Sequence, residues 1–77
     1  MTVRIYTTSH CPYCTMAKKF FESKGISFEE VNVEQDQQKA AEMVEKSGQM
    51  GVPVIEINGE IIIGFNRPEI ERALSKE

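Results

Sequence analysis

The stretch "YTTSHCPYCTMAKKFF", residues 6–21, holds both cysteines of the chain at the point where one residue pattern replaces another. The segment "VRIYT", which overlaps its start, alternates β-branched residues with others and predicts a strand. From Pro12 onward the apolar residues recur at helical spacing. The stretch therefore predicts a strand that leads into a helix, with Cys11 just before the first helical turn and Cys14 one turn inside it.

The rest of the chain continues to alternate strand and helix patterns. "SFEEVNV" returns to β-type residues, and a second helix is expected from roughly Asp36 to Ser47. "VPVIEINGEIIIGF" predicts two short strands around Asn58-Gly59, a dipeptide typical of tight hairpins. A last helix is expected from about Pro68, with Asn66 as its capping residue.

These elements predict an α/β fold with the order β-α-β-α-β-β-α. The strand–helix–strand unit requires a right-handed crossover, so the first two strands should be parallel. The hairpin adds an antiparallel pair, which gives a mixed four-stranded sheet flanked by three helices. We expect residues 1–77 to form one domain, because a chain of this length supplies only a modest core.

Composition and charge exclude several classes of function. The net charge is −3 with mixed signs and no basic patch, which argues against nucleic acid as a partner. The longest apolar run, residues 61–63, is far below the ~20 residues of a membrane span, so we expect no membrane partner. The first residues enter a strand pattern without a signal-peptide core, and we expect a cytoplasmic protein.

The cysteine pair has three readings: a structural disulfide, half of a metal site or a redox pair. A disulfide over so short a loop stabilises little. Zinc needs four ligands, and the chain has no second ligand pair; its one histidine, His10, is adjacent to Cys11. We therefore expect no metal site within one chain, although a cluster shared between two copies stays open as an alternative.

The redox reading follows from the place of each thiol on the predicted helix. At the helix start, Cys11 faces unpaired backbone N–H groups and the positive end of the helix dipole, which favour its thiolate. The thiolate is the attacking species in disulfide exchange. Cys14 lies three residues further on the same helix face, where it can attack a mixed disulfide on Cys11.

Four segments of the chain resemble the glutaredoxin family: "CPYC", its continuation "TMAK", "GVPV" and "INGEIIIGF". The resemblance covers nearly the whole chain. It implies a thioredoxin-like fold and reduction of protein disulfides and glutathione mixed disulfides, with Cys11 as the nucleophile and Cys14 as the resolving thiol. It further implies glutathione as a co-substrate, no tightly bound cofactor, disulfide-containing or glutathionylated proteins as partners, and a monomer.

The resemblance also implies a glutathione site. In the family, an aromatic residue at the position of Tyr13 flanks the ligand, and the backbone at Val52 pairs with its cysteinyl part. The bond between Val52 and Pro53 is expected to be cis. The residues expected to bind glutathione or substrate, which include a glycine that admits the ligand and two residues at the start of the last helix, are Tyr13, Val52, Pro53, Gly64, Asn66 and Arg67.

Three positions depart from the family pattern. Thr8 stands where many glutaredoxins carry a lysine that meets a glutathione carboxylate, Gly51 where a threonine is usual, and Gln49 where a basic residue is common. Because the chain is net acidic, affinity for glutathione must come from local positive charges. Arg67 and Lys18 are the candidate side chains.

The segment "GFNRPE" leaves two alternative functions open. It resembles a sister group, the glutaredoxin-like redoxins that take electrons from thioredoxin reductase and serve ribonucleotide reductase. Those proteins carry a different pair of residues between their cysteines, so the chain combines the two patterns. The alternative from another class is a non-catalytic binding or iron–sulfur carrier module on the same fold.

Overall fold

The computed structural model describes residues 2–76 and contains seven elements in the predicted order. Their bounds are β1 Val3–Thr7, α1 Pro12–Ser23, β2 Glu29–Asn32, α2 Gln37–Ser47, β3 Val54–Ile57, β4 Glu60–Ile63 and α3 Arg67–Ser75. The strands form one sheet in the order β2-β1-β3-β4. β1 pairs with β2 in parallel, and β3 pairs antiparallel with β1 and β4, which confirms the mixed sheet.

Local capping sets the helix boundaries. The helix expected from Asp36 begins one residue later, because Asp36 is the N-cap and its side chain accepts a hydrogen bond from the Lys39 N–H at 3.2 Å. Gly48 ends that helix with φ 75°, a left-handed conformation that glycine adopts without a steric penalty. The Pro12 position also agrees with prediction, since α1 begins there.

The β3–β4 hairpin turns at the predicted dipeptide. Asn58 and Gly59 have φ values of 50° and 89°, and a type I′ turn requires positive φ at both central residues. Asn58 also joins the turn to the chain start: the Thr2 N–H donates to Asn58 Oδ1 at 2.8 Å, and the Asn58 N–H donates to the Thr2 carbonyl at 2.9 Å. The turn therefore joins β3 to β4 and also fixes the start of β1 through the two hydrogen bonds with Thr2.

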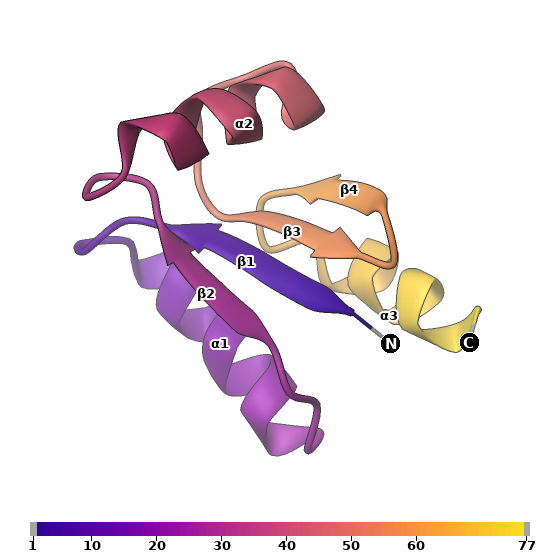
Figure 1. Ribbon diagram of the computed structural model, residues 1–77. Helices are drawn as coiled ribbons and strands as arrows, with labels where there is room; N and C mark the ends of the chain where they lie inside the picture. The colour runs from indigo at the N-terminus through magenta and orange to yellow at the C-terminus, as the bar shows by residue number, and fades with distance from the viewer. Residues whose placement is uncertain (1, 77) are drawn as a thin grey trace.

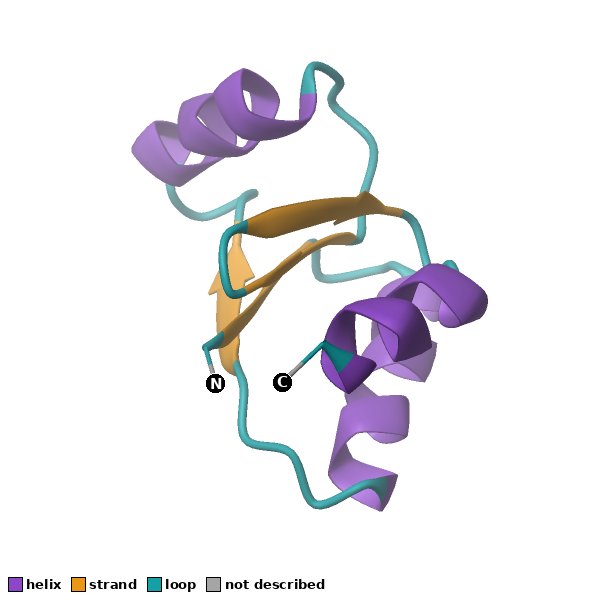
Figure 2. Ribbon diagram, turned by 90° about the vertical axis from the view of Figure 1, so that its right-hand side faces the viewer, coloured by secondary structure: helices purple, strands orange, loops and turns teal. Residues whose placement is uncertain are grey.

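The helices cover the sheet unequally. α1 and α3 lie side by side on one face, whereas α2 lies alone on the opposite face (Figures 1 and 2). Side chains alternate between the faces along a strand, so β1 contributes Val3 and Ile5 to the α1/α3 face and Tyr6 to the α2 face. The larger buried cluster lies under α1 and α3: Val3, Ile5, Ala17, Phe20, Phe21, Ile55, Ile57, Ile62, Ile70 and Ala73.

The α2 face combines a small apolar cluster with a polar network. Its buried residues are Tyr6, Val31, Met43 and Val54. The Tyr6 hydroxyl donates to Glu42 Oε1 at 2.8 Å, and Arg4 and Lys46 form ion pairs with the same carboxylate at 3.2 and 3.4 Å. Within residues 2–76, no helix is both long and apolar enough to cross a membrane.

Candidate active site

The two cysteines differ sharply in exposure. Cys11 is the N-cap of α1 and is half-buried, while Cys14 in the first turn is 1% exposed. Both are free thiols, and the Cys14 N–H donates to Cys11 Sγ at 3.1 Å. A hydrogen bond donated to sulfur stabilises the thiolate more than the thiol. A substrate can therefore reach the sulfur of Cys11, whereas the sulfur of Cys14 is covered by protein.

Burial keeps Cys14 in its protonated form near neutral pH. Desolvation raises the pKa of Cys14 to about 12, and its hydrogen bond with Cys11 acts in the same direction. The Thr8 backbone and the positive charge of Lys18 oppose this shift by lowering the pKa of Cys14. A thiol with so high a pKa reacts slowly from the resting state, so the first attack belongs to Cys11.

A polar contact under α1 places Lys18 near Cys14. Lys18 lies one helical turn beyond Cys14, and its ammonium group donates to Glu30 Oε2 at 2.8 Å. The Thr7 hydroxyl, which is fully buried, donates to the same oxygen at 3.0 Å. The bond from Lys18 lowers the pKa of Glu30. Lys18 was considered above as a cation for glutathione, but in this structure it is held by Glu30.

Sequence reasoning missed Thr7 and Glu30. Neither residue belongs to a motif, and 23 positions separate them along the chain. The parallel pairing of β1 with β2, with Tyr6 opposite Val31, places them next to each other. Strand alternation was the available signal, because Glu30 precedes the buried Val31 and must face the opposite side of the sheet.

The loop before β3 presents an unpaired backbone segment. The Val52–Pro53 peptide bond is cis, as the resemblance predicted. Gly64, with φ 78°, donates its N–H to the Pro53 carbonyl at 2.8 Å, which ties this loop to the turn after β4. Within residues 2–76, the backbone N–H and C=O of Val52 form no hydrogen bond. They are therefore available to an extended ligand.

The Gln49 side chain forms hydrogen bonds within the same loop. Gln49 accepts a hydrogen bond from the Gly51 N–H at 2.6 Å and donates to the Gly51 carbonyl at 3.0 Å. A Cβ atom built on Gly51 would lie 2.8 Å from Gln49 Oε1, so a larger residue would displace the glutamine. Gln49 and Gly51, which both depart from the family pattern, are therefore linked by hydrogen bonds into one local structure next to Val52.

The start of α3 combines a cap with a charged side chain. Asn66 is the N-cap, and its Oδ1 accepts from the Glu69 N–H at 3.5 Å. Arg67 forms an exposed pair with Glu71 at 3.1 Å, and its guanidinium carbon lies 5.1 Å from the centre of the Phe20 ring. The charge of Arg67 is therefore partly offset before any ligand arrives.

Sheet register gathers the predicted site residues at one end of the sheet. The partners Tyr6 and Val54, and Val54 and Ile63, align the end of β1, the start of β3 and the end of β4. The residues that follow or precede these ends are the ones predicted: Cys11, Tyr13 and Cys14 after β1; Val52 and Pro53 before β3; Gly64, Asn66 and Arg67 after β4. Tyr13 follows Cys11 by two residues in the first turn of α1 and is 61% exposed.

A half-buried, accessible thiol at a helix start, with a buried thiol in the first turn and a mixed four-stranded sheet behind them, defines a thiol–disulfide oxidoreductase with a thioredoxin-like fold. The chain belongs to the glutaredoxin family, whose family model matches residues 3–62.

Known proteins of the two redoxin groups are similar to this chain. It is 46% identical over 74 residues to a glutaredoxin-like 8.6 kDa protein in the rubredoxin operon of Clostridium pasteurianum, covering 96% of this chain and 99% of that one. It is 44% identical to Glutaredoxin 3 of Escherichia coli, covering 80% and 75% of the two chains. The NrdH-redoxin structure from Escherichia coli superposes with a TM-score of 0.80 at 32% identity, covering 94% and 93%.

Proposed function

We propose that this protein reduces glutathione mixed disulfides and protein disulfides in the cytoplasm, with glutathione as electron donor and without a tightly bound cofactor. The observation that carries the proposal is Cys11 at the N-cap of α1, accepting the Cys14 N–H at 3.1 Å. Membership of the glutaredoxin family and similarity to Glutaredoxin 3 support glutathione as the donor.

The first step is attack of the Cys11 thiolate on one sulfur of the substrate disulfide. The substrate S–S bond breaks, a new S–S bond joins Cys11 to one half of the substrate, and the other half leaves as a thiolate that takes up a proton. The N–H of Cys14 and the α1 dipole stabilise the reactive Cys11 thiolate.

Two routes resolve this mixed disulfide. On a protein substrate, Cys14 loses its proton and attacks Cys11, which releases the reduced substrate and forms the Cys11–Cys14 disulfide. Two glutathione molecules then reduce that bond and leave as glutathione disulfide, so two electrons pass from glutathione to the substrate. On a glutathione mixed disulfide, one free glutathione attacks the Cys11 adduct directly.

The role of each cysteine can be tested by replacement. Cys11→Ser should abolish both activities, because no other accessible sulfur can attack. Cys14→Ser should retain reduction of glutathione mixed disulfides and lose reduction of protein disulfides. Both rates are measured on purified variants, with Lys39→Gln on α2 as a folded control that retains both cysteines. Reduction of protein disulfides by Cys14→Ser at the parent rate would contradict the resolving role.

The glutathione site itself can be tested through charge. With Thr8 at this position, the loop after β1 has no lysine or arginine, so we expect a weakened apparent affinity for glutathione. Thr8→Lys should strengthen it by up to about tenfold at low salt and less at high salt, because exposed charge pairs are screened. Arg67→Ala should weaken it by less, since Glu71 already offsets that charge. The measurement is the rate of mixed-disulfide reduction against glutathione concentration.

A second candidate function is a redoxin reduced by thioredoxin reductase that serves ribonucleotide reductase. It is favoured by the 32% identity to the NrdH-redoxin, whose structure is described as the basis for a thioredoxin-like activity profile. The two donors are compared directly: glutathione with glutathione reductase, and thioredoxin reductase with NADPH. Two results together would favour this candidate. Thioredoxin reductase would reduce the Cys11–Cys14 disulfide efficiently, and neither Thr8→Lys nor Arg67→Ala would change the dependence of the rate on glutathione concentration.

A further inference from the structure

Among the described residues, two lysines stand apart from the ion pairs of the surface. Within residues 2–76, Lys19 and Lys24 form no ion pair with a carboxylate. The other seven of the nine Lys and Arg residues each pair with at least one: Arg4, Lys18, Lys39, Lys46, Arg67, Arg72 and Lys76. In a chain of net charge −3, two such positive charges, Lys19 on α1 and Lys24 at its C-cap, are a distinct local feature.

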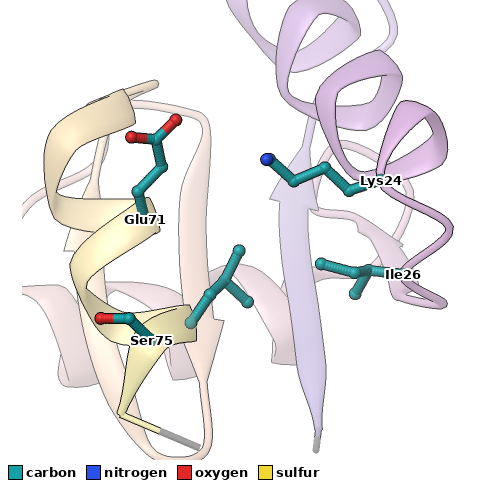
Figure 3. A pocket seen from close by; sticks show the side chains of 5 residues that line it. Lys24, Ile26, Glu71 and Ser75 are labelled. Carbon is teal, nitrogen blue, oxygen red and sulfur yellow. The ribbon is translucent and has the colours of Figure 1, made fainter.

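Both lysines border the same groove. It lies between α1 and α3, measures about 510 Å³ and is lined by Met16, Lys19, Phe20, Ser23, Lys24, Phe65 and Arg67. Lys24 also borders the adjoining hollow of about 640 Å³, where it and Ile26 point toward α3, across from Glu71 and Ser75 (Figure 3). Two hollows that share Lys24 therefore lie between α1 and α3.

The groove is apolar between its charged rims. Met16 is 48% exposed, and Phe20 contacts Phe65 edge to face with ring centres 5.9 Å apart. The Lys24 ammonium lies 5.2 Å from the centre of the Phe20 ring. Methionine adapts its shape to different partners, and exposed apolar surface rimmed by polar groups is typical of a binding surface. Such a surface suits a segment that carries both acidic and apolar side chains.

The position of the groove relates it to the redox site. Met16 follows Cys14 by two residues on α1, and Arg67 opens α3 directly after Asn66. One end of the groove thus lies where α1 and α3 begin, at the same end of the sheet as the thiols, and the rest extends along α1. Glutathione is expected at the Val52 backbone and the start of α3, so Arg67 is the residue that the groove shares with that site.

We propose that the α1–α3 groove docks an acidic, apolar peptide segment that flanks the disulfide of a protein substrate; this inference rests on the proposed function. Carboxylates of the segment pair with Lys19 and Lys24, and one of its apolar side chains packs on Met16 and Phe20. The groove then selects among protein disulfides by the residues around them, while small disulfides are reduced without it.

Binding is measured first, without redox chemistry. The probe is a fluorescein-labelled, cysteine-free peptide with the repeating residues Asp, Leu, Glu and Phe, and fluorescence anisotropy reports its affinity for the parent at low salt. Lys19→Gln with Lys24→Gln should weaken binding roughly 3- to 10-fold, the scale of two exposed charge contacts. The matched control, Lys39→Gln with Lys76→Gln, has the same change of net charge away from the groove and should bind as the parent.

Two further arms test the apolar floor and the peptide charge. Met16→Gln should weaken binding, whereas Val44→Gln on α2, another exposed apolar position, should not. A peptide with Asn and Gln in place of Asp and Glu should bind weakly to every variant. Equal losses in the groove and control double variants, or equal binding of the neutral peptide, would overturn the proposal.

Activity then connects the groove to catalysis. The same acidic and neutral sequences are placed around a disulfide, and kcat/KM for their reduction is measured. The groove double variant should lose roughly 3- to 10-fold on the acidic substrate and nothing on the neutral one or on a small glutathione mixed disulfide. An equal loss on all three substrates would overturn the docking role. Absence of reduction by the parent on every substrate would refute the proposed function, and the anisotropy result would still decide whether the groove binds.

Discussion

The two faces of the sheet are stabilised by different means. Under α1 and α3 the contacts are almost wholly apolar, with aromatic rings such as Phe20 and Phe21 packed edge to face at 5.5 Å. Under α2 the buried apolar cluster is small, and ion pairs around the Tyr6 hydroxyl accompany it. The difference shows how a small domain divides hydrophobic burial and polar contacts between two layers.

The redox pair belongs to the apolar face, and this placement has a chemical consequence. Cys14 packs on that side with Ala17 and Phe21, and its burial there raises its pKa to about 12. A thiol on the α2 face would meet the charged network instead. The polar contacts from Thr7 and Lys18 to Glu30 lie under α1, and the charge of Lys18 lowers the pKa of Cys14. Four substitutions test this comparison, from the largest expected effect to the smallest.

Phe21→Ala breaks the apolar face at its centre. Phe21 is fully buried, so the variant should lose roughly 3–5 kcal/mol of unfolding free energy through lost burial and a cavity. Urea denaturation measures the change, with Met16→Ala, at a half-exposed position of the same helix, as the control. A loss below about 1 kcal/mol, the typical effect of a point mutation, would show that the faces do not differ in this way.

Tyr6→Phe breaks the polar face and leaves its shape intact. The hydroxyl donates to Glu42 and accepts from Arg4 at 3.4 Å, so its removal should cost roughly 1–2 kcal/mol. The control is Tyr13→Phe, whose ring is exposed and whose loss of a hydroxyl should change stability little. Stability is measured by thermal or urea unfolding. If Tyr6→Phe lowers it no more than Tyr13→Phe does, the hydrogen-bond network around Tyr6 does not stabilise the α2 face.

Lys18→Met tests the polar contact near the redox pair. The charge of Lys18 lowers the pKa of Cys14, so its removal should make the Cys14 thiolate harder to form. Reduction of protein disulfides should slow roughly 3- to 10-fold, about 0.7–1.4 kcal/mol, whereas reduction of glutathione mixed disulfides should change little. Lys39→Met, an equal charge change on α2, is the control. Equal slowing of both activities would assign Lys18 another role.

Glu42→Gln gives the smallest effect, and one that depends on pH. The hydrogen bond from Tyr6, then the lysines nearby, lower the pKa of Glu42. Its stabilising contribution is therefore fully present above the unfolded pKa of about 4.3 and is lost as pH falls through the lower folded value. Melting temperatures of the parent and the variant should differ near neutral pH and approach each other as pH falls below the unfolded pKa of about 4.3. A difference that stays constant down to pH 3 would contradict the assignment.

Most of the local structure was predictable from short stretches of sequence. Asn58-Gly59 predicted the hairpin, and Pro12 after Cys11 predicted where α1 begins and which of the two thiols is more buried. For α2 the sequence predicts a helix from about Asp36, whereas in the structure Asp36 is the N-cap and the helix begins at Gln37. Such features depend on interactions within about four residues, so the sequence contains all the partners.

Tertiary structure decided the contacts between distant segments. No local pattern states that β3 lies between β1 and β4, and this strand order brings the Val52 backbone to the end of the sheet where α1 begins. The contact of Thr7 with Glu30 needs the parallel register of β1 and β2, and the groove with Lys19 and Lys24 needs α3 to pack beside α1. Strand order, register and helix packing follow from burial summed over the whole chain, so short-range patterns cannot specify them.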